Sequence, residues 1–182
     1  MELQRAMLTS PGKITHVVMD VDGTLTRGDI CYDGKGDELK TFCTRDGVGF
    51  FAARWAGLHP VILTGRTSVA VERRAADFGV EFLHQGVDDK RRWLADFMER
   101  NGFGRERLAY IGDDLNDYGA MGLAAFVGCP LDACEEVRAL ANYVAACKGG
   151  EGAVRDVLRC LLRLRGQWDE ALRALYGVEG SR

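Results

Sequence analysis

The sequence lacks any apolar run long enough to cross a membrane, and its first residues lack the apolar stretch of a secretory signal peptide. An excess of charge of one sign is also missing, because the net charge is -3 and the pI is near 5.7. We therefore expect a cytoplasmic protein whose main partner is neither a membrane nor nucleic acid. Small anionic substrates are not excluded, since a binding site needs only local positive charge.

CxxC spacing, which is typical of zinc sites, is absent although the chain has six cysteines. We therefore expect reduced, buried thiols rather than a zinc centre or a disulfide framework. Internal repeats and low-complexity linkers are absent as well. The length of 182 residues suits one sizeable core, so we expect a single domain over residues 1–182.

Short apolar, β-branched runs alternate with amphipathic segments along the chain, and this pattern predicts strands and helices in turn. The predicted strands are 14–19, 60–63, 80–83, 108–111, 124–127 and 143–145. The predicted helices are 48–55, 69–78, 89–101 and a tail helix, 152–176, broken near Gly166. Residues 27–42 hold two β-prone pieces around a Gly-rich turn and predict a β-hairpin flap. The alternation predicts an α/β fold, a parallel sheet with helices on both faces.

An acidic pair, Asp20 and Asp22, directly follows the first predicted strand. A carboxylate at the first position can attack phosphorus and form an aspartyl phosphate, which divides one difficult step into two. A carboxylate two residues later can protonate the leaving oxygen and then deprotonate the attacking water. Gly23 follows and allows the chain to turn sharply toward the flap.

Polar residues also follow the later strands, and the ligand of such a sheet binds at the carboxyl ends of the strands. The Thr64 hydroxyl and the Gly65 amide can hold phosphate oxygens at a helix N-terminus. Lys90 opens a helix and can neutralise charge on both the nucleophile and the phosphate. Asp113 can complete an oxygen-rich Mg²⁺ site with the Asp20 carboxylate and the Asp22 carbonyl.

Each of these pieces also has an ordinary structural interpretation. An isolated Asp-x-Asp-Gly can be a turn, and a Thr-Gly pair can be a strand-to-helix cap. A lone lysine on a helix is usually solvated, and a Gly-Asp-Asp run is often an acidic turn. The four pieces stand in this order, each at the end of a predicted strand. Their combination therefore favours a phosphoryl-transfer site, with Asp114 and Asp117 placed to orient Lys90 or a metal-bound water.

On these residues the chain resembles the haloacid dehalogenase superfamily, whose four motifs match Asp20 with Asp22, Thr64, Lys90, and Asp113 with Asp114. Further matches, over about residues 13–175, point to the capless 3-deoxy-D-manno-octulosonate 8-phosphate (KDO 8-phosphate) phosphatases of lipopolysaccharide synthesis. These further matches are Ile30, 36–40, 45–47, 64–66, Glu72, Arg74, 85–86, 112–117, 149–150 and 152–155.

The resemblance implies a Rossmann-like fold without a cap domain, a Mg²⁺ cofactor and a phosphoric monoester hydrolase. It also implies a homotetramer, in which the hairpins form a central barrel and a neighbour's flap and tail (149–182) help to close each site. The substrate would be a small sugar-acid phosphate. The residues implied to bind it, in addition to Asp22, are Arg45, Asp46, Gly47, Arg66 and Arg74, because guanidinium groups bind carboxylates bidentately. Asn116 would support the metal site beside Asp114 and Asp117.

Several positions depart from the family pattern. Arg27 stands where Asp is usual, Cys43 where Asn is usual, and Glu151 where Arg is usual; Cys31 and Val48 each replace a Tyr. A glutamate facing the carboxylate of the substrate would repel it. The leading hypothesis is therefore a KDO 8-phosphate phosphatase, and the first alternative is a phosphatase of a related nonulosonate phosphate or another small sugar phosphate. The third hypothesis is a non-catalytic oligomerisation module linked to sugar activation.

Overall fold

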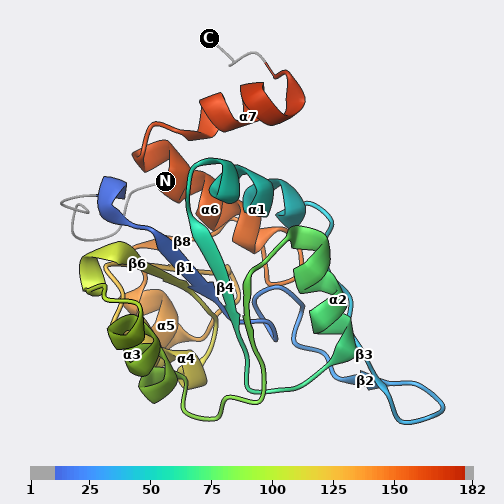
Figure 1. The fold of residues 1–182 in the computed structure, drawn as a ribbon. Coiled ribbons are helices and arrows are strands. Elements are labelled where there is room, and N and C mark those ends of the chain that lie inside the picture. Colours follow the sequence, from blue (N-terminus) through green and yellow to red (C-terminus); the bar gives the residue numbers. More distant parts are fainter. Residues whose placement is uncertain (1–10, 179–182) are drawn as a thin grey trace.

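Six parallel strands form the central sheet of the computed structural model, which describes residues 11–178 (Figure 1). Residues 1–10 and 179–182, the two ends of the predicted domain and the last part of the predicted tail, lie outside the described residues. The strands are β1 (His16–Met19), β4 (His59–Leu63), β5 (Phe82–His84), β6 (Leu108–Ile111), β7 (Phe126–Cys129) and β8 (Tyr143–Val144). Their spatial order is β5-β4-β1-β6-β7-β8, so β1 lies between β4 and β6.

Helices cover both faces of the sheet, and alternate residues of β1 pack against different helices. Val17 and Met19 belong to the core under α1 (Asp46–Trp55), α2 (Val69–Phe78), α6 (Ala153–Leu164) and α7 (Trp168–Tyr176). Val18 belongs to the core under α3 (Lys90–Arg100), α4 (Leu115–Met121) and α5 (Glu135–Leu140). Two short 3-10 helices, η1 (Pro11–Lys13) and η2 (Arg105–Arg107), precede β1 and β6. The predicted α/β fold with helices on both faces is confirmed (Figure 1).

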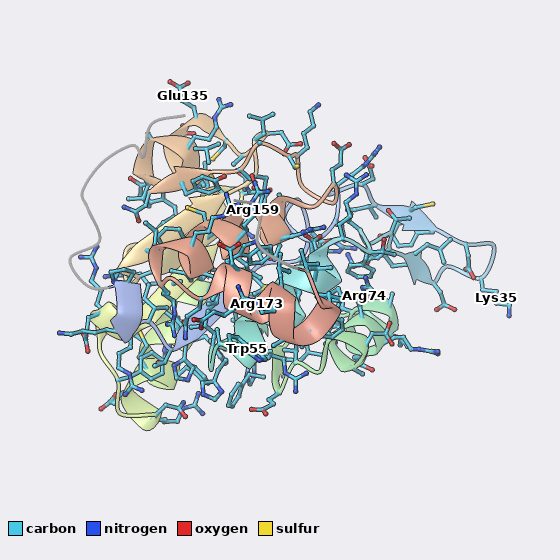
Figure 2. All side chains as sticks on the ribbon, turned by 90° about the horizontal axis from the view of Figure 1, so that it is seen from above. Lys35, Trp55, Arg74, Glu135, Arg159 and Arg173 are labelled. Carbon is cyan, nitrogen blue, oxygen red and sulfur yellow. The ribbon has the colours of Figure 1, made fainter. Side chains whose placement is uncertain are left out.

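The flap between β1 and α1 is an antiparallel hairpin of β2 (Cys31–Tyr32) and β3 (Glu38–Leu39). Its turn is closed by a hydrogen bond from the Gly36 amide to the Asp33 carbonyl, 3.1 Å long. The hairpin projects from the rest of the molecule, with Lys35 at its tip (Figure 2). No cap domain is inserted between the elements of residues 11–178, as predicted.

The structure differs from the predicted elements mainly at their ends and in two short helices. Strands β1, β5 and β7 each begin two residues later than predicted, and α1 begins at Asp46 because the turn at Arg45 is already helical. Helices α4 and α5 were not predicted; they have only seven and six residues, too short for a clear apolar periodicity. The break at Gly166 is confirmed, with a left-handed φ of 70° that ends the tail's first helix. Among residues 11–178, no helix combines the length and apolar character needed to cross a bilayer.

Candidate active site

The candidate site lies where the three central strands end at their carboxyl termini. Asp20 directly follows β1, Thr64 directly follows β4, and Asp113 follows β6 after one glycine. Because β1 pairs with β4 on one side and β6 on the other, these three segments meet at one edge of the sheet. Asp20 and Thr64 are buried, with 3% and 1% of their surfaces exposed.

Lys90 connects the nucleophile candidate to a second buried carboxylate. Its ammonium, at the first position of α3, lies 2.8 Å from Asp20 Oδ1 and 2.7 Å from Asp117 Oδ1. Tyr110 on β6 also donates its hydroxyl to Asp117 Oδ1, at 2.7 Å, and the Asp113 amide donates to Asp117 Oδ2, at 3.2 Å. Asp117 is therefore held on both of its oxygens, and it fixes the position of the lysine.

The site holds more negative than positive charge. One carboxylate oxygen from each of Asp20, Asp113 and Asp117 lies within 4.8 Å of the others, and Lys90 is the cation bonded to two of the three. Burial and the neighbouring Asp117 charge raise the pKa of Asp20, although Lys90 opposes the shift. Burial also raises the pKa of Asp113, to about 7. A further cation would offset this repulsion and keep Asp20 ionised.

The donor set fits Mg²⁺, because the available atoms are hard carboxylate oxygens. Asp117 already accepts hydrogen bonds on both oxygens, which leaves Asp20 and Asp113 as the carboxylates best placed to coordinate a metal. Thr24 donates to Asp113 Oδ1 at 2.9 Å and orients that side chain. Gly23 has a left-handed φ of 86°, and a Cβ there would lie 2.0 Å from Asp113 Oδ2. Only glycine lets the backbone after Asp22 approach the Asp113 carboxylate so closely.

The acid/base candidate Asp22 belongs to a second ionic network, formed with the flap. Lys40, just beyond β3, donates to Asp22 Oδ1 and to Glu38 Oε1, the latter at 2.8 Å. Arg66 donates to the same Glu38 through Nε and Nη2, at 3.2 and 3.0 Å. Burial disfavours the ammonium of Lys40, but its hydrogen bonds to the two carboxylates outweigh this and raise its pKa. Lys40 therefore stays protonated beside Asp22.

The phosphate-binding candidates Thr64 and Gly65 lie in a loop rather than at a helix N-terminus. Helix α2 begins only at Val69, so the predicted placement of Thr64 and Gly65 at a helix N-terminus is wrong, and they do not form a strand-to-helix cap either. The Thr64 amide donates to the His84 carbonyl at 3.0 Å, which fixes the loop to the end of β5. The predicted phosphate contacts of the Thr64 hydroxyl and the Gly65 amide stay predictions.

No family model matches the chain, but individual proteins resemble it over most of its length. It is 37% identical to the KDO 8-phosphate phosphatase of Salmonella typhi over 165 residues, 91% of this chain and 88% of that protein. It is 38% identical to the enzyme of Escherichia coli K12 over 155 residues, 85% of this chain and 82% of that one.

Solved structures agree with this similarity. The KDO 8-phosphate phosphatase of Moraxella catarrhalis, crystallised in complex with magnesium ion, phosphate ion and KDO, matches with a TM-score of 0.87 and 36% identity, covering 92% of this chain and 96% of that chain. The cobalt-bound phosphatase of Haemophilus influenzae matches with a TM-score of 0.83 and 33% identity, covering 88% and 94%. The chain belongs to the KDO 8-phosphate phosphatase family. The predicted superfamily and branch are therefore confirmed.

The residues that the family resemblance implied for substrate binding do not share one environment in the structure. Asp46 begins α1 with 1% of its surface exposed, and its Oδ1 accepts the Arg155 amide of α6 at 2.8 Å. Arg74 stacks over Phe78, 4.0 Å from the ring centre, and donates to the Cys43 carbonyl at 3.3 Å. Both groups therefore support the packing of the loop that precedes α1 in this structure.

Arg45 lines a surface pocket of about 360 Å³ beside the tail. Glu151 and Arg155 line the same pocket, and the catalytic candidates do not. Gly47 is buried, with the ring of Phe78 3.2 Å from the position of a Cβ. Of the predicted substrate residues, Arg66 and Asp22 are linked through Glu38 and Lys40, and Arg74 lies close enough to Asp46 for its charge to act on that carboxyl group.

Two departures from the family pattern contact each other. Arg27 Nη2 lies 3.0 Å from Glu151 Oε1, so the glutamate has a cationic partner at the base of the flap. The loop that carries Glu151 also packs closely against the loop that follows Asp20, since a Cβ at Gly149 would lie 1.8 Å from the Gly23 carbonyl oxygen. The two unusual charges therefore neutralise one another.

The supporting candidates divide into one buried and two exposed side chains. Asp117 is buried and bonded to Lys90, whereas Asp114 is exposed and accepts the Leu115 amide at 2.8 Å as the N-cap of α4. Asn116 is exposed on the first turn of α4.

Four residues that orient the site residues were not among the predicted site residues. Two of them, Glu38 and Lys40, lie within the segment 36–40 that matches the family, but no role was predicted for either. These residues are Thr24, Glu38, Lys40 and Tyr110.

Proposed function

We propose that this protein hydrolyses KDO 8-phosphate to KDO and inorganic phosphate with Mg²⁺ as cofactor, as a step in the synthesis of lipopolysaccharide precursors. One observation carries the proposal: in a chain of this family, the buried Asp20 carboxylate is bonded to Lys90 and adjoins the Asp113 carboxylate. This arrangement gives a nucleophile, a fixed positive charge and a pair of metal ligands at one point.

In the first step Asp20 attacks the phosphorus, and the bond between phosphorus and the sugar oxygen breaks. Asp22 gives its proton to that oxygen, so KDO leaves as an alcohol and the phosphoryl group stays on Asp20. Lys90 balances the charge of the nucleophile and of the transferred group. Bound Mg²⁺ supplies charge neutralisation and in-line alignment of the phosphoryl group at Asp20 and Asp113.

In the second step the Asp22 carboxylate takes a proton from water, and the resulting hydroxide attacks the phosphorus. The bond between phosphorus and Asp20 breaks, which releases inorganic phosphate and restores both carboxyl groups to their starting states. Thr64 and Gly65 are proposed to hold the non-reacting phosphate oxygens. Arg66, with Arg45, Asp46, Gly47 and Arg74, is proposed to contribute to binding of the sugar acid. Arg66 is the best placed of these, since it is linked to Asp22 through the flap.

We also propose that the protein acts as a cytoplasmic homotetramer assembled through the flap. Three large apolar side chains on this hairpin are more than half exposed: Ile30 (54%), Tyr32 (59%) and Leu39 (52%). The hairpin projects away from the protein's own core (Figure 2), so a neighbouring subunit is the natural partner for these side chains. Light scattering should give four subunits, and Leu39→Ser should shift the protein toward smaller species.

The test of the function is phosphate release from KDO 8-phosphate in the presence of Mg²⁺. Asp20→Asn should abolish turnover because an amide cannot act as the nucleophile, and chelation of Mg²⁺ should do the same. Asp96→Asn, at an exposed carboxylate on α3, is the matched control and should keep wild-type activity.

The alternatives give distinct outcomes on a panel of phosphate esters. Faster turnover of a nine-carbon sugar-acid phosphate or of a neutral sugar phosphate would change the substrate but keep the chemistry. Mg²⁺ binding without turnover of any ester would overturn the proposal and indicate a non-catalytic module.

A further inference from the structure

The side chain of Lys40 is almost completely covered, although the residue belongs to an exposed hairpin and is only half-buried as a whole. Only 2% of its side chain is exposed, while the preceding Leu39 is half exposed. Its ammonium lies between two carboxylates, Asp22 on the loop after β1 and Glu38 on β3. The flap therefore places one charged group inside the site, on the residue proposed as the proton donor.

This contact fixes the orientation of Asp22. The Asp22 side chain is 24% exposed, and a partly solvated aspartate has several accessible rotamers. Lys40 engages Oδ1, which leaves Oδ2 as the oxygen able to carry the transferable proton. Glu38, held in turn by Arg66, prevents Lys40 from turning away.

We infer that Lys40 is a positioning residue for Asp22: it holds the carboxyl group so that Oδ2 faces the leaving oxygen, and Glu38 anchors Lys40. The inference rests on the proposed phosphatase function and deepens it. It assigns the flap a part in the proton transfer, in addition to its proposed part in assembly.

A positioning role for the proton donor has a chemical consequence. A sugar alkoxide is a strongly basic leaving group and needs its proton during bond cleavage, whereas p-nitrophenolate leaves readily without one. Misplacing Asp22 should therefore slow the cleavage of esters in proportion to the basicity of the leaving group. A general loss of structure or of phosphate binding would slow all esters alike.

The experiment compares wild type with Lys40→Met and Lys40→Arg on KDO 8-phosphate, phenyl phosphate and p-nitrophenyl phosphate. The measured quantity is kcat/KM, because it reports the steps up to phosphoryl transfer to Asp20 and leaves out the later attack of water. Lys40→Met should lose about 10- to 100-fold on the sugar phosphate, less on phenyl phosphate and least on p-nitrophenyl phosphate. Lys40→Arg, which keeps the charge, should recover part of the loss.

Two further variants keep the inference testable if Lys40→Met is unstable. Glu38→Gln leaves Lys40 in place but loosens it, and should show the same dependence on the leaving group with a smaller loss. In an Asp22→Asn background, Lys40→Met should cost little on the sugar phosphate, because there is no proton donor left to orient.

The pattern of losses across the three esters separates the inference about Lys40 from the proposed function. Equal losses on all three esters would overturn the inference, as would a full additional loss in the Asp22→Asn background. A loss confined to KDO 8-phosphate would also overturn it, because that result places Lys40 on the substrate carboxylate. If wild type itself releases phosphate from none of the esters, the proposed function fails instead.

Discussion

The titration of Asp46 should have a measurable effect on the stability of the fold. This carboxyl group is 1% exposed, and burial raises its pKa from 3.8 to about 6. The hydrogen bond from the Arg155 amide and the charges of Arg74 and Arg155 oppose the shift without cancelling it. Its second oxygen, Oδ2, accepts no hydrogen bond among the described residues, which leaves the ionised form poorly compensated.

The sign of the effect follows from the two pKa values. In the unfolded chain Asp46 releases its proton near pH 3.8, and in the folded protein near pH 6. Between these values the folded state binds more protons, so the free energy of unfolding falls as the pH rises. A shift of roughly two pKa units corresponds to about 3 kcal/mol, fully lost above about pH 6.

Asp46→Asn isolates this contribution, because an amide oxygen can still accept from the Arg155 amide but the side chain cannot ionise. The free energy of unfolding of the variant, relative to wild type, should rise by about 2 kcal/mol between about pH 4 and pH 7, because part of the effect is already present at pH 4. Urea unfolding at equal protein concentration and without Mg²⁺ measures the difference at each pH. Asp96→Asn is the matched control for loss of an exposed carboxylate. A difference that stays constant over this range would refute the reasoning.

Substitutions at three further positions test the loops around Asp20. Gly23→Ala should lower kcat/KM and Mg²⁺ affinity by roughly ten- to hundred-fold, because the left-handed φ and the contact with Asp113 cost ~1–3 kcal/mol. A Mg²⁺ titration of activity measures the affinity. An unchanged affinity would contradict the expected clash with Asp113. Arg27→Glu and Glu151→Arg should each cost less than about 1 kcal/mol of stability, because both side chains are largely exposed, and the double charge swap should restore it. Thermal unfolding of the four proteins forms the cycle, and additive losses would show that the pair does not interact.

Most of the fold and the proximity of Asp20, Lys90 and Asp113 could be predicted because their signals are local. Asp20 and Asp113 stand next to strong apolar strands, and Lys90 follows an N-cap aspartate, Asp89, that accepts the Arg92 amide at 2.9 Å. The carboxyl ends of neighbouring parallel strands must meet, so the order of motifs already predicted the Asp20–Lys90–Asp113 cluster. The short helices α4 and α5 gave no such signal, since seven or fewer residues hold too few turns to show a period.

The partners of the site residues could not be predicted, because they depend on contacts between distant segments. The family resemblance placed Asp46 in a substrate loop, but it gave no sign that this carboxyl group accepts an amide 109 residues later in the chain. Glu151 looked like a charge that would repel the substrate, yet its neighbour in space is Arg27, at the base of the flap. Neither spacing nor periodicity carries information about such pairs.

The position of the flap also depends on contacts between distant segments. Its two strands have two residues each, and a hairpin of that size is marginally stable by itself. Its position relative to Asp22 therefore depends on Lys40, on the Arg66–Glu38 contact and on the neighbour proposed to cover Ile30, Tyr32 and Leu39. Arg66 donates to Glu38 through Nε and Nη2, so a substrate carboxylate would bind through the remaining N–H groups, chiefly those of Nη1. Arg66 would then link the sugar acid to Glu38 and, through Lys40, to the proposed proton donor Asp22.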